Sequence, residues 1–266
     1  MTEKTRSRFI NDIYVNREYS WLLFDKRVLE QSQDLSNPLL ERCKFLSIFS
    51  SNLDEFFMVR VGSLYNESLS DAQARDNKTQ LTAAKQLEGV CEAVKDLYAE
   101  RAVCYFRLKK ELSKYGVRIL RADELTPRQK EEARTVFMTH VLPLLSLMVL
   151  DAKHPLMQFE NMKNYMLYDL ERDGRHMVGV MAFNAALDRL YRIGGGEKAR
   201  LVPLEELVRA FGHNAFTGYT AGGRMMMRVT RNADFDTNVD DADLEHDFDF
   251  SKYMKRKVEL RSTLDA

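Results

Sequence analysis

The sequence predicts a multi-domain protein, with an all-α N-terminal helical domain over residues 1–115 and an α+β head domain over residues 116–266. Apolar residues recur every three or four positions through the first part, which is typical of amphipathic helices. In the second part, short apolar runs separated by glycine-containing turns indicate antiparallel strands. A length of 266 residues accommodates two domains of ordinary size.

The composition is that of an ordinary water-soluble protein. Lys plus Arg and Asp plus Glu number 40 each, so the formal net charge is zero and no global attraction to nucleic acid or an anionic membrane is expected. No apolar run approaches the length of a membrane span, and the N-terminus lacks the apolar segment of a signal peptide. We therefore expect a cytoplasmic protein. Cys43, Cys91 and Cys104 lie on apolar helical faces and are interpreted as buried free thiols, with a disulfide or metal role as the alternative.

The first two helices are predicted from apolar spacing and from their boundaries. Ser20 is the expected N-cap of a helix that carries Trp21 and Leu29 and ends near residues 36–38. Pro38 suits the first turn of the next helix, where its missing N–H does no harm. Trp21 is the only tryptophan. We interpret it as a core residue, with a stacking platform for a nucleotide base as the alternative.

The longest periodic segment runs from Leu81 to Leu112 and follows a polar loop over residues 68–77. Its narrow apolar stripe predicts one long amphipathic helix, which should pack on the earlier helices. Gly116 stands where a left-handed C-terminal cap is needed.

The head domain is predicted to open with a helix and to continue with strands. Thr126 and Gln129 form a capping box with Pro127 at the first helical position, and this helix extends toward Val141. The other predicted elements are strands over 164–170, 176–183, 190–193, 200–202 and 224–230, a short helix over 203–210 and a helical segment over 240–257. The first two strands are expected to form a hairpin.

The run Ser50–Ser51–Asn52 places polar groups among large apolar residues. One interpretation is a helix restart, with Asn52 as N-cap and Glu55 as the third helical residue of a capping box. The other is that the Asn52 amide, which both donates and accepts, contacts a ligand such as a purine edge or a ribose or phosphate oxygen. A helix start would also present free N–H groups to an anion. The two interpretations are compatible.

The remaining candidate sites are weaker. The five histidines, His140, His154, His176, His213 and His246, lack partners at metal-ligand spacing, so no metal site is predicted. His154 lies in a string, 151–155, that a tight turn explains, with a role as nucleophile or general acid as the alternative. The acidic run over 234–245 lacks the spacing of a calcium loop and is interpreted as solvated.

Two glycine runs and one basic string also stand out in the second part of the chain. Gly194–Gly196 and Gly222–Gly223 lack the spacing of a phosphate-binding loop, so both are predicted to be hairpin turns. Arg228, Arg231 and Asp234 end a predicted strand, and an ion pair is the expected role of this string. The residues by themselves therefore contain no complete catalytic constellation.

Several strings nevertheless match a known family in order and in spacing. The chain resembles the long, phosphohistidine-type polyphosphate kinases in residues 16–21, 28–30, 36–42, 44–57, 151–155 and 229–234. These strings are spread over essentially the whole chain.

The resemblance implies a fold and a function. Members of this family have an N-terminal helical domain, a head domain and two C-terminal domains similar to the halves of phospholipase D. They transfer the terminal phosphate of ATP reversibly to polyphosphate through a phosphohistidine, assisted by Mg²⁺. The resemblance implies that Asn52 contacts ATP, that the helical domain closes one side of the nucleotide pocket, and that the head domain takes part in homodimer contacts.

The resemblance also implies what this chain lacks. The family's phosphorylated histidine, metal-binding residues and polymer tunnel belong to the C-terminal domains, and none of the five histidines here matches the catalytic motif. We therefore expect an N-terminal portion that is inactive alone, with no catalytic or metal-binding residue of its own. The alternative is a non-catalytic module for dimerisation or interaction.

Overall fold

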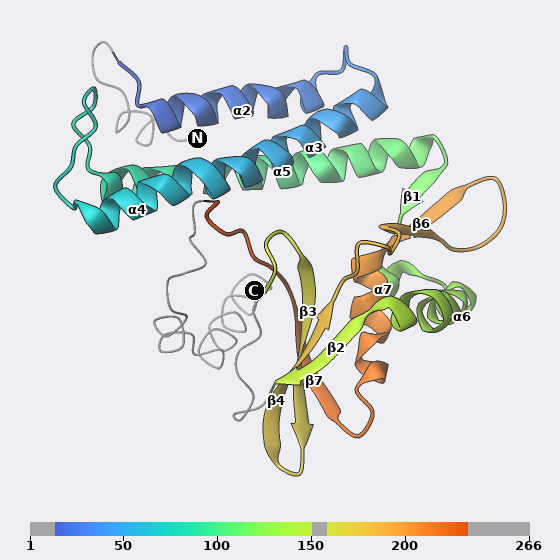
Figure 1. The fold of residues 1–266 in the computed structure, drawn as a ribbon. Coiled ribbons are helices and arrows are strands. Elements are labelled where there is room, and N and C mark those ends of the chain that lie inside the picture. Colours follow the sequence, from blue (N-terminus) through green and yellow to red (C-terminus); the bar gives the residue numbers. More distant parts are fainter. Residues whose placement is uncertain (1–13, 151–158, 234–266) are drawn as a thin grey trace, which may run out of the picture. The chain divides into compact units, whose positions relative to one another are not determined.

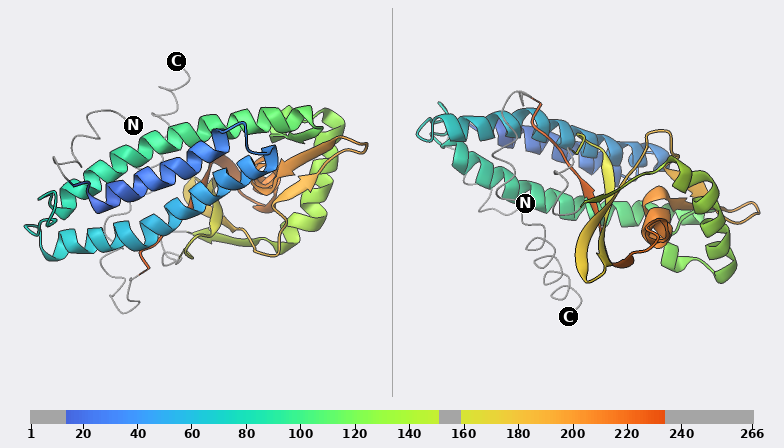
Figure 2. Two further views of the ribbon diagram at one scale, coloured as in Figure 1. Left: turned by 90° about the horizontal axis from the view of Figure 1, so that it is seen from above. Right: turned by 60° about the horizontal axis from the view of Figure 1, so that its bottom comes forward.

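The helical region consists of three long helices that pack against one another and one short helix, α4. The computed structural model describes residues 14–150 and 159–233, which lie within one unit by their contacts. The helices are α2 (Arg17–Gln33), α3 (Leu39–Phe56), α4 (Gly62–Ser70) and α5 (Ala83–Lys114). A π-helical turn, Phe57–Val61, joins α3 to α4 without a break. Figures 1 and 2 show α2, α3 and α5 side by side, and their shared core is apolar.

The core of these helices contains the residues expected from the apolar spacing. Its buried members include Leu22, Leu29, Phe49, Leu53, Val90, Leu97 and Leu108. Cys104 is buried as predicted, Cys43 is half-buried, and all three cysteines are free. The prediction is wrong for Cys91, which is exposed because it lies at the edge of the narrow apolar stripe of α5.

The first helix begins earlier than predicted. Its N-cap is Asn16 rather than Ser20, and the Asn16 side-chain oxygen accepts from the N–H groups of Glu18 and Tyr19 at 3.0 and 3.2 Å. Asn16 also donates to the Gln86 side chain on α5 at 2.7 Å. An amide can cap one helix and bind a second, which a serine hydroxyl at position 20 could not do from inside the first turn.

The long helix matches its prediction closely. It spans 32 residues, or about 48 Å at 1.5 Å per residue. Gly116 has a φ of +81°, the left-handed conformation expected just after the helix. Immediately beyond it lies β1 (Val117–Ile119), the first strand of the head region.

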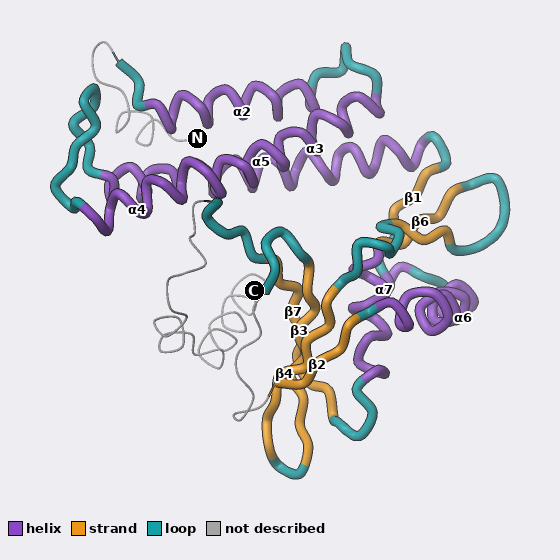
Figure 3. Tube along the Cα trace, viewed as in Figure 1, coloured by secondary structure: helices purple, strands orange, loops and turns teal. Residues whose placement is uncertain are grey.

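The head region combines helices with two small sheets, which confirms the predicted fold class. Figure 3 shows the helices of the first part in purple and the strands that follow in orange. The elements after β1 are α6 (Pro127–Val136), β2 (Ser146–Leu150), β3 (Asn164–Arg172), β4 (Arg175–Ala182), β5 (Leu190–Arg192), β6 (Ala199–Pro203), α7 (Leu204–Phe211) and β7 (Thr220–Arg228). The predicted capping box of Thr126 and Gln129 opens α6.

The strands form one sheet of order β2-β4-β3-β7 and one of order β1-β6-β5. The larger sheet is antiparallel, as predicted, but β1 pairs with β6 in parallel. The β3–β4 hairpin closes through Asp173 and Gly174, both with positive φ, so its turn is shorter than the five residues expected.

One glycine prediction is confirmed and the other is wrong. Gly194 and Gly196 adopt positive φ between β5 and β6, as a turn requires. Gly222–Gly223 instead lies within β7. A Cβ at Gly222 would come within 3.2 Å of an Asp169 carboxylate oxygen on β3, so this glycine leaves space beside a neighbouring strand.

The head core lies between the larger sheet and the helices of the head region. It includes Phe137, Val141, Tyr168, Met181, Leu207 and Phe211. His154, Asp234, the acidic run and the helical segment predicted over 240–257 lie outside the described residues. Within the described ranges, no helix is both long and apolar enough to cross a membrane.

Candidate functional site

Side chains from α2 and α3 meet in matched pairs along the line where these antiparallel helices touch. Trp21 stacks on Phe56 with ring centroids 4.4 Å apart, and the Asn52 amide nitrogen donates to an Asp25 carboxylate oxygen at 2.9 Å. Successive pairs lie one turn apart on both helices, as expected for side chains four residues apart. We call these four residues the α2–α3 seam.

The structure places Asn52 inside α3 rather than at a helix start. The predicted capping box with Glu55 is therefore wrong, because α3 runs from Leu39 to Phe56 and continues into the π-helical turn. Phe49, Leu53 and Phe56 keep the helical period through this position, and their burial outweighs the local preference of asparagine for a cap. Asn52 is half-buried and its amide binds Asp25 instead of the backbone.

Asp25 is the residue at this seam that sequence reasoning missed. Its exposed fraction is 0%, and its second carboxylate oxygen has no hydrogen-bond partner among the described residues. Burial raises the pKa of Asp25 to about 6, and the hydrogen bond from Asn52 opposes this rise. A signal was present in the sequence, because Asp25 lies at helical spacing between the apolar residues Leu22 and Leu29.

We expect Asp25→Asn to raise the free energy of unfolding above pH 6 by about 1–3 kcal/mol. The pKa of Asp25 in the folded state is above its usual value of 3.8, so between pH 3.8 and about 6 the folded state binds more protons than the unfolded state. Wild-type stability therefore falls as the pH rises through this window, and the loss is complete above it. The new amide group is also buried and has one end without a hydrogen-bond partner. The increase in the free energy of unfolding therefore stays below the upper end of this range.

Urea unfolding across this pH window measures the effect. The variant should lose the fall in stability that the wild type shows, whereas Asp188→Asn, at an exposed position, should keep it. An identical pH dependence in Asp25→Asn and wild type would contradict the assignment.

Two strings that are far apart in the sequence meet beside the seam. Arg228 on β7 forms an ion pair with Asp54 on α3, and the N–H of Ala233 donates to the carbonyl of Met58 at 2.9 Å. The N–H of Arg231 donates to the Asn161 side chain at 2.9 Å. The ion pair expected within residues 228–234 involves Asp234, which lies outside the described residues, whereas Arg228 pairs with Asp54 of the helical region.

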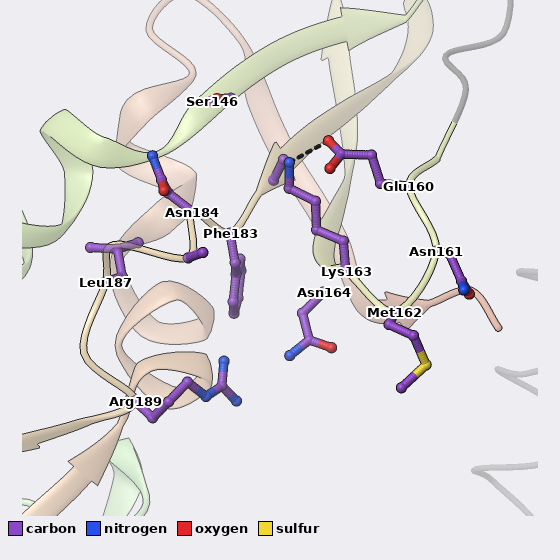
Figure 4. Close-up of a pocket in the computed structure, with 12 residues that line it drawn as sticks. Ser146, Glu160, Asn161, Met162, Lys163, Asn164, Phe183, Asn184, Leu187 and Arg189 are labelled. Carbon is purple, nitrogen blue, oxygen red and sulfur yellow. Dashed lines mark hydrogen bonds and ion pairs between the residues drawn. The ribbon is translucent and has the colours of Figure 1, made fainter. Parts of the chain in front are cut away.

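A separate cavity of about 530 Å³ lies in the head region, and Figure 4 shows the side chains that line it. Its lining is rich in amides and carries two cations, Lys163 and Arg189. Lys163 pairs with Glu160, and Arg189 pairs with Glu205. Burial lowers the pKa of Arg189, with a contribution from the nearby Arg228. Because carboxylates already pair with both cations, the cavity is not a ready-made anion site. Among the described residues, Asn52 does not line it.

The described residues contain no group of side chains that could form a metal site. Within residues 14–150 and 159–233, no three His, Cys, Asp or Glu side chains are grouped closely enough to hold an ion. His140, His176 and His213 therefore belong to no such group, although the Nδ1 of His176 lies 3.3 Å from a carboxylate oxygen of Asp169.

Comparison with known proteins identifies the family. The family model described as the polyphosphate kinase N-terminal domain matches residues 14–120, and the model of the polyphosphate kinase middle domain matches residues 128–266. The chain belongs to the polyphosphate kinase family. This confirms the resemblance found in the sequence.

Individual polyphosphate kinases show the same relationship. The enzyme of Exiguobacterium sp. is 35% identical over 86% of this chain, and that of Bacillus cereus is 38% identical over 83%. A crystal structure of polyphosphate kinase from Porphyromonas gingivalis superimposes on 84% of the chain with a TM-score of 0.71 at 24% identity, which supports the fold. The chain spans about a third of the length of these relatives.

Proposed function

We propose that this chain supplies the helical and head domains, residues 1–115 and 116–266, of an ATP:polyphosphate phosphotransferase that acts reversibly. In this proposal Asn52 contacts ATP, the chain associates with itself, and the enzyme works in the cytoplasm. Membership of the polyphosphate kinase family supports the reaction class. The observation that carries the site is the half-exposed Asn52 amide, which a buried carboxylate holds in place.

The contribution of these residues is positioning. Phosphoryl transfer depends on holding the nucleotide in line with its acceptor and on neutralising phosphate charge. The α2–α3 seam offers a fixed amide and a half-exposed indole, which can orient a nucleotide, but its charged member is a carboxylate. Mg²⁺ does not fit the described residues, because they contain no group of three carboxylate, imidazole or thiol side chains that could hold it.

We expect Asn52→Ala to raise the KM for ATP about two- to thirteenfold, which corresponds to about 0.5–1.5 kcal/mol for one lost hydrogen bond. The assay uses a chimera in which residues 1–266 replace the matching segment of the Bacillus cereus polyphosphate kinase. The measured quantity is ATP-dependent elongation of polyphosphate.

A matched control separates this effect from general damage to the helices. Asn66→Ala removes an exposed amide from α4 and should leave the KM unchanged. A folded Asn52→Ala chimera with wild-type kinetics would reject the role of Asn52.

The second candidate function is a non-catalytic dimerisation module. It is favoured by apolar side chains on the outer face of α5, where Val103 and Phe106 are 50% and 63% exposed. Exposed apolar groups gathered on one helix are typical of association surfaces. A chain that forms dimers in sedimentation experiments, together with a chimera that elongates no polyphosphate, would favour this module over the kinase.

A further inference from the structure

We propose that Asp25 is a positioning residue that orients the Asn52 amide so that Asn52 binds the edge of the adenine ring and discriminates ATP from GTP. This inference rests on the proposed function, because it assigns a part of the nucleotide to the residue that we propose as its contact.

The hydrogen bond between the two side chains fixes the orientation of the amide. The Asn52 nitrogen donates to Asp25 at 2.9 Å. A carboxylate can only accept, so the nitrogen end of the amide must face Asp25 and the oxygen end must face away. When Asp25 takes the N–H that points away from the amide oxygen, the other N–H and the oxygen lie side by side. The amide then presents one donor and one acceptor along the same edge.

This pair of groups matches adenine and mismatches guanine. Asparagine binds adenine in a bidentate way, its oxygen accepting from the N6 amino group and its N–H donating to N7. Guanine carries an acceptor oxygen where adenine carries the amino group, so the amide oxygen would face another oxygen. An amide held in this orientation therefore selects adenine over guanine.

The surroundings favour a base over a phosphate. Because α3 is continuous through Asn52, the backbone there offers no free N–H groups to an anion. The buried Asp25 carboxylate beside the amide repels negative charge. One turn away, the half-exposed indole of Trp21 stacks on Phe56 and supplies a flat apolar surface of the kind that purines rest on.

The burial of Asp25 also indicates a role beyond packing. Its second oxygen is enclosed without a hydrogen-bond partner among the described residues. A carboxylate in such a place destabilises the fold, and an apolar residue on this buried face of α2 would pack without that cost. Strained or unsatisfied groups of this kind gather at functional sites.

Titration of the chimera with ATP and GTP, monitored by NMR of the Asn52 side-chain amide, tests the proposal. We expect wild type to bind ATP at least about fivefold more tightly than GTP. In Asp25→Asn the ratio should fall toward one, because two facing amides can pair in either orientation. Asp188→Asn, at an exposed position, should keep the wild-type ratio. A purely structural role of Asp25 would weaken both nucleotides alike.

The outcomes separate the inference from the proposed function. If Asn52→Ala binds ATP as tightly as wild type does, or if wild type does not bind ATP, the ATP contact of Asn52 and the inference about Asp25 are both rejected. If Asn52→Ala loses affinity while Asp25→Asn keeps the ATP-to-GTP ratio, only the role of Asp25 is overturned. If Asp25→Asn does not fold, the wild-type protein alone tests the proposal. Equal affinities for ATP and GTP, or equal chemical-shift changes of the Asn52 amide with the two nucleotides, would overturn it. Preferential shifts with ATP would support it.

Discussion

Gly212→Ala is expected to lower the free energy of unfolding by about 4 kcal/mol, because it combines overpacking with the loss of a buried hydrogen bond. Gly212 follows α7 with an ordinary helical φ of −62°, so the difficulty is space rather than backbone strain. A Cβ at this position would overlap the hydroxyl oxygen of Tyr168 and would lie 3.2 Å from the sulfur of Met181. Tyr168 is 1% exposed and donates to the carbonyl of Val208 at 2.8 Å, so it cannot move aside without losing that bond.

Chemical denaturation of the variant and two companions tests this explanation. Gly195→Ala should be close to neutral, since no atom lies within 4 Å of the added Cβ and its φ is not in the left-handed region. The double variant Gly212→Ala/Tyr168→Phe removes the overlapping oxygen and should recover part of the loss. A Gly212→Ala protein as stable as wild type would show that the core around Tyr168 accommodates a methyl group.

Glu111→Ala should lower the free energy of unfolding by about 3 kcal/mol, the lower end of the range for breaking a buried ion pair. Arg42 on α3 is 5% exposed, and its guanidinium binds both oxygens of Glu111 on α5 at 2.8 and 3.3 Å. It also donates to the carbonyl of Ser32 at the end of α2. Without Glu111 the buried guanidinium keeps, of its hydrogen bonds to described residues, the one to this neutral carbonyl. The 30% exposure of the Glu111 side chain lets water reduce the loss, which places the estimate at the lower end.

The matched control is Glu55→Ala, which removes an exposed carboxylate from α3 and should change the stability little. Replacing both partners, as in Arg42→Met/Glu111→Leu, should restore most of the stability, because a well-packed apolar pair needs no charge compensation. A single Glu111→Ala variant that unfolds at the wild-type urea concentration would contradict the idea that this pair joins the helices.

Local patterns predicted most of the helices, because spacing and caps act over a few residues. The stripe from Leu81 to Leu112 yields α5 within two residues at each end, and Thr126 and Gln129 cap α6 as expected. Partners that come from elsewhere in the chain were not predictable. Asn16 rather than Ser20 caps α2 because it also reaches Gln86, 70 positions away.

The same limit applies to the short strands and to the site. The three residues of β1 form a strand because they pair with β6, about 80 positions later in the chain. The sequence of β2 has no alternation of apolar and polar residues that would predict a strand. The sequence singled out Asn52 through the family resemblance, but its local pattern suggested a cap. Recognising Asp25 as the partner of Asn52 required knowing that α2 and α3 run antiparallel in contact.

The pairing of Trp21 with Phe56 has a practical consequence. Because the chain contains a single tryptophan, its ultraviolet emission originates from one known place, the contact between α2 and α3. Any event that draws these helices apart exposes the indole to water and shifts its emission to the red. The intrinsic fluorescence of the protein therefore reports on that contact without a dye or an engineered label.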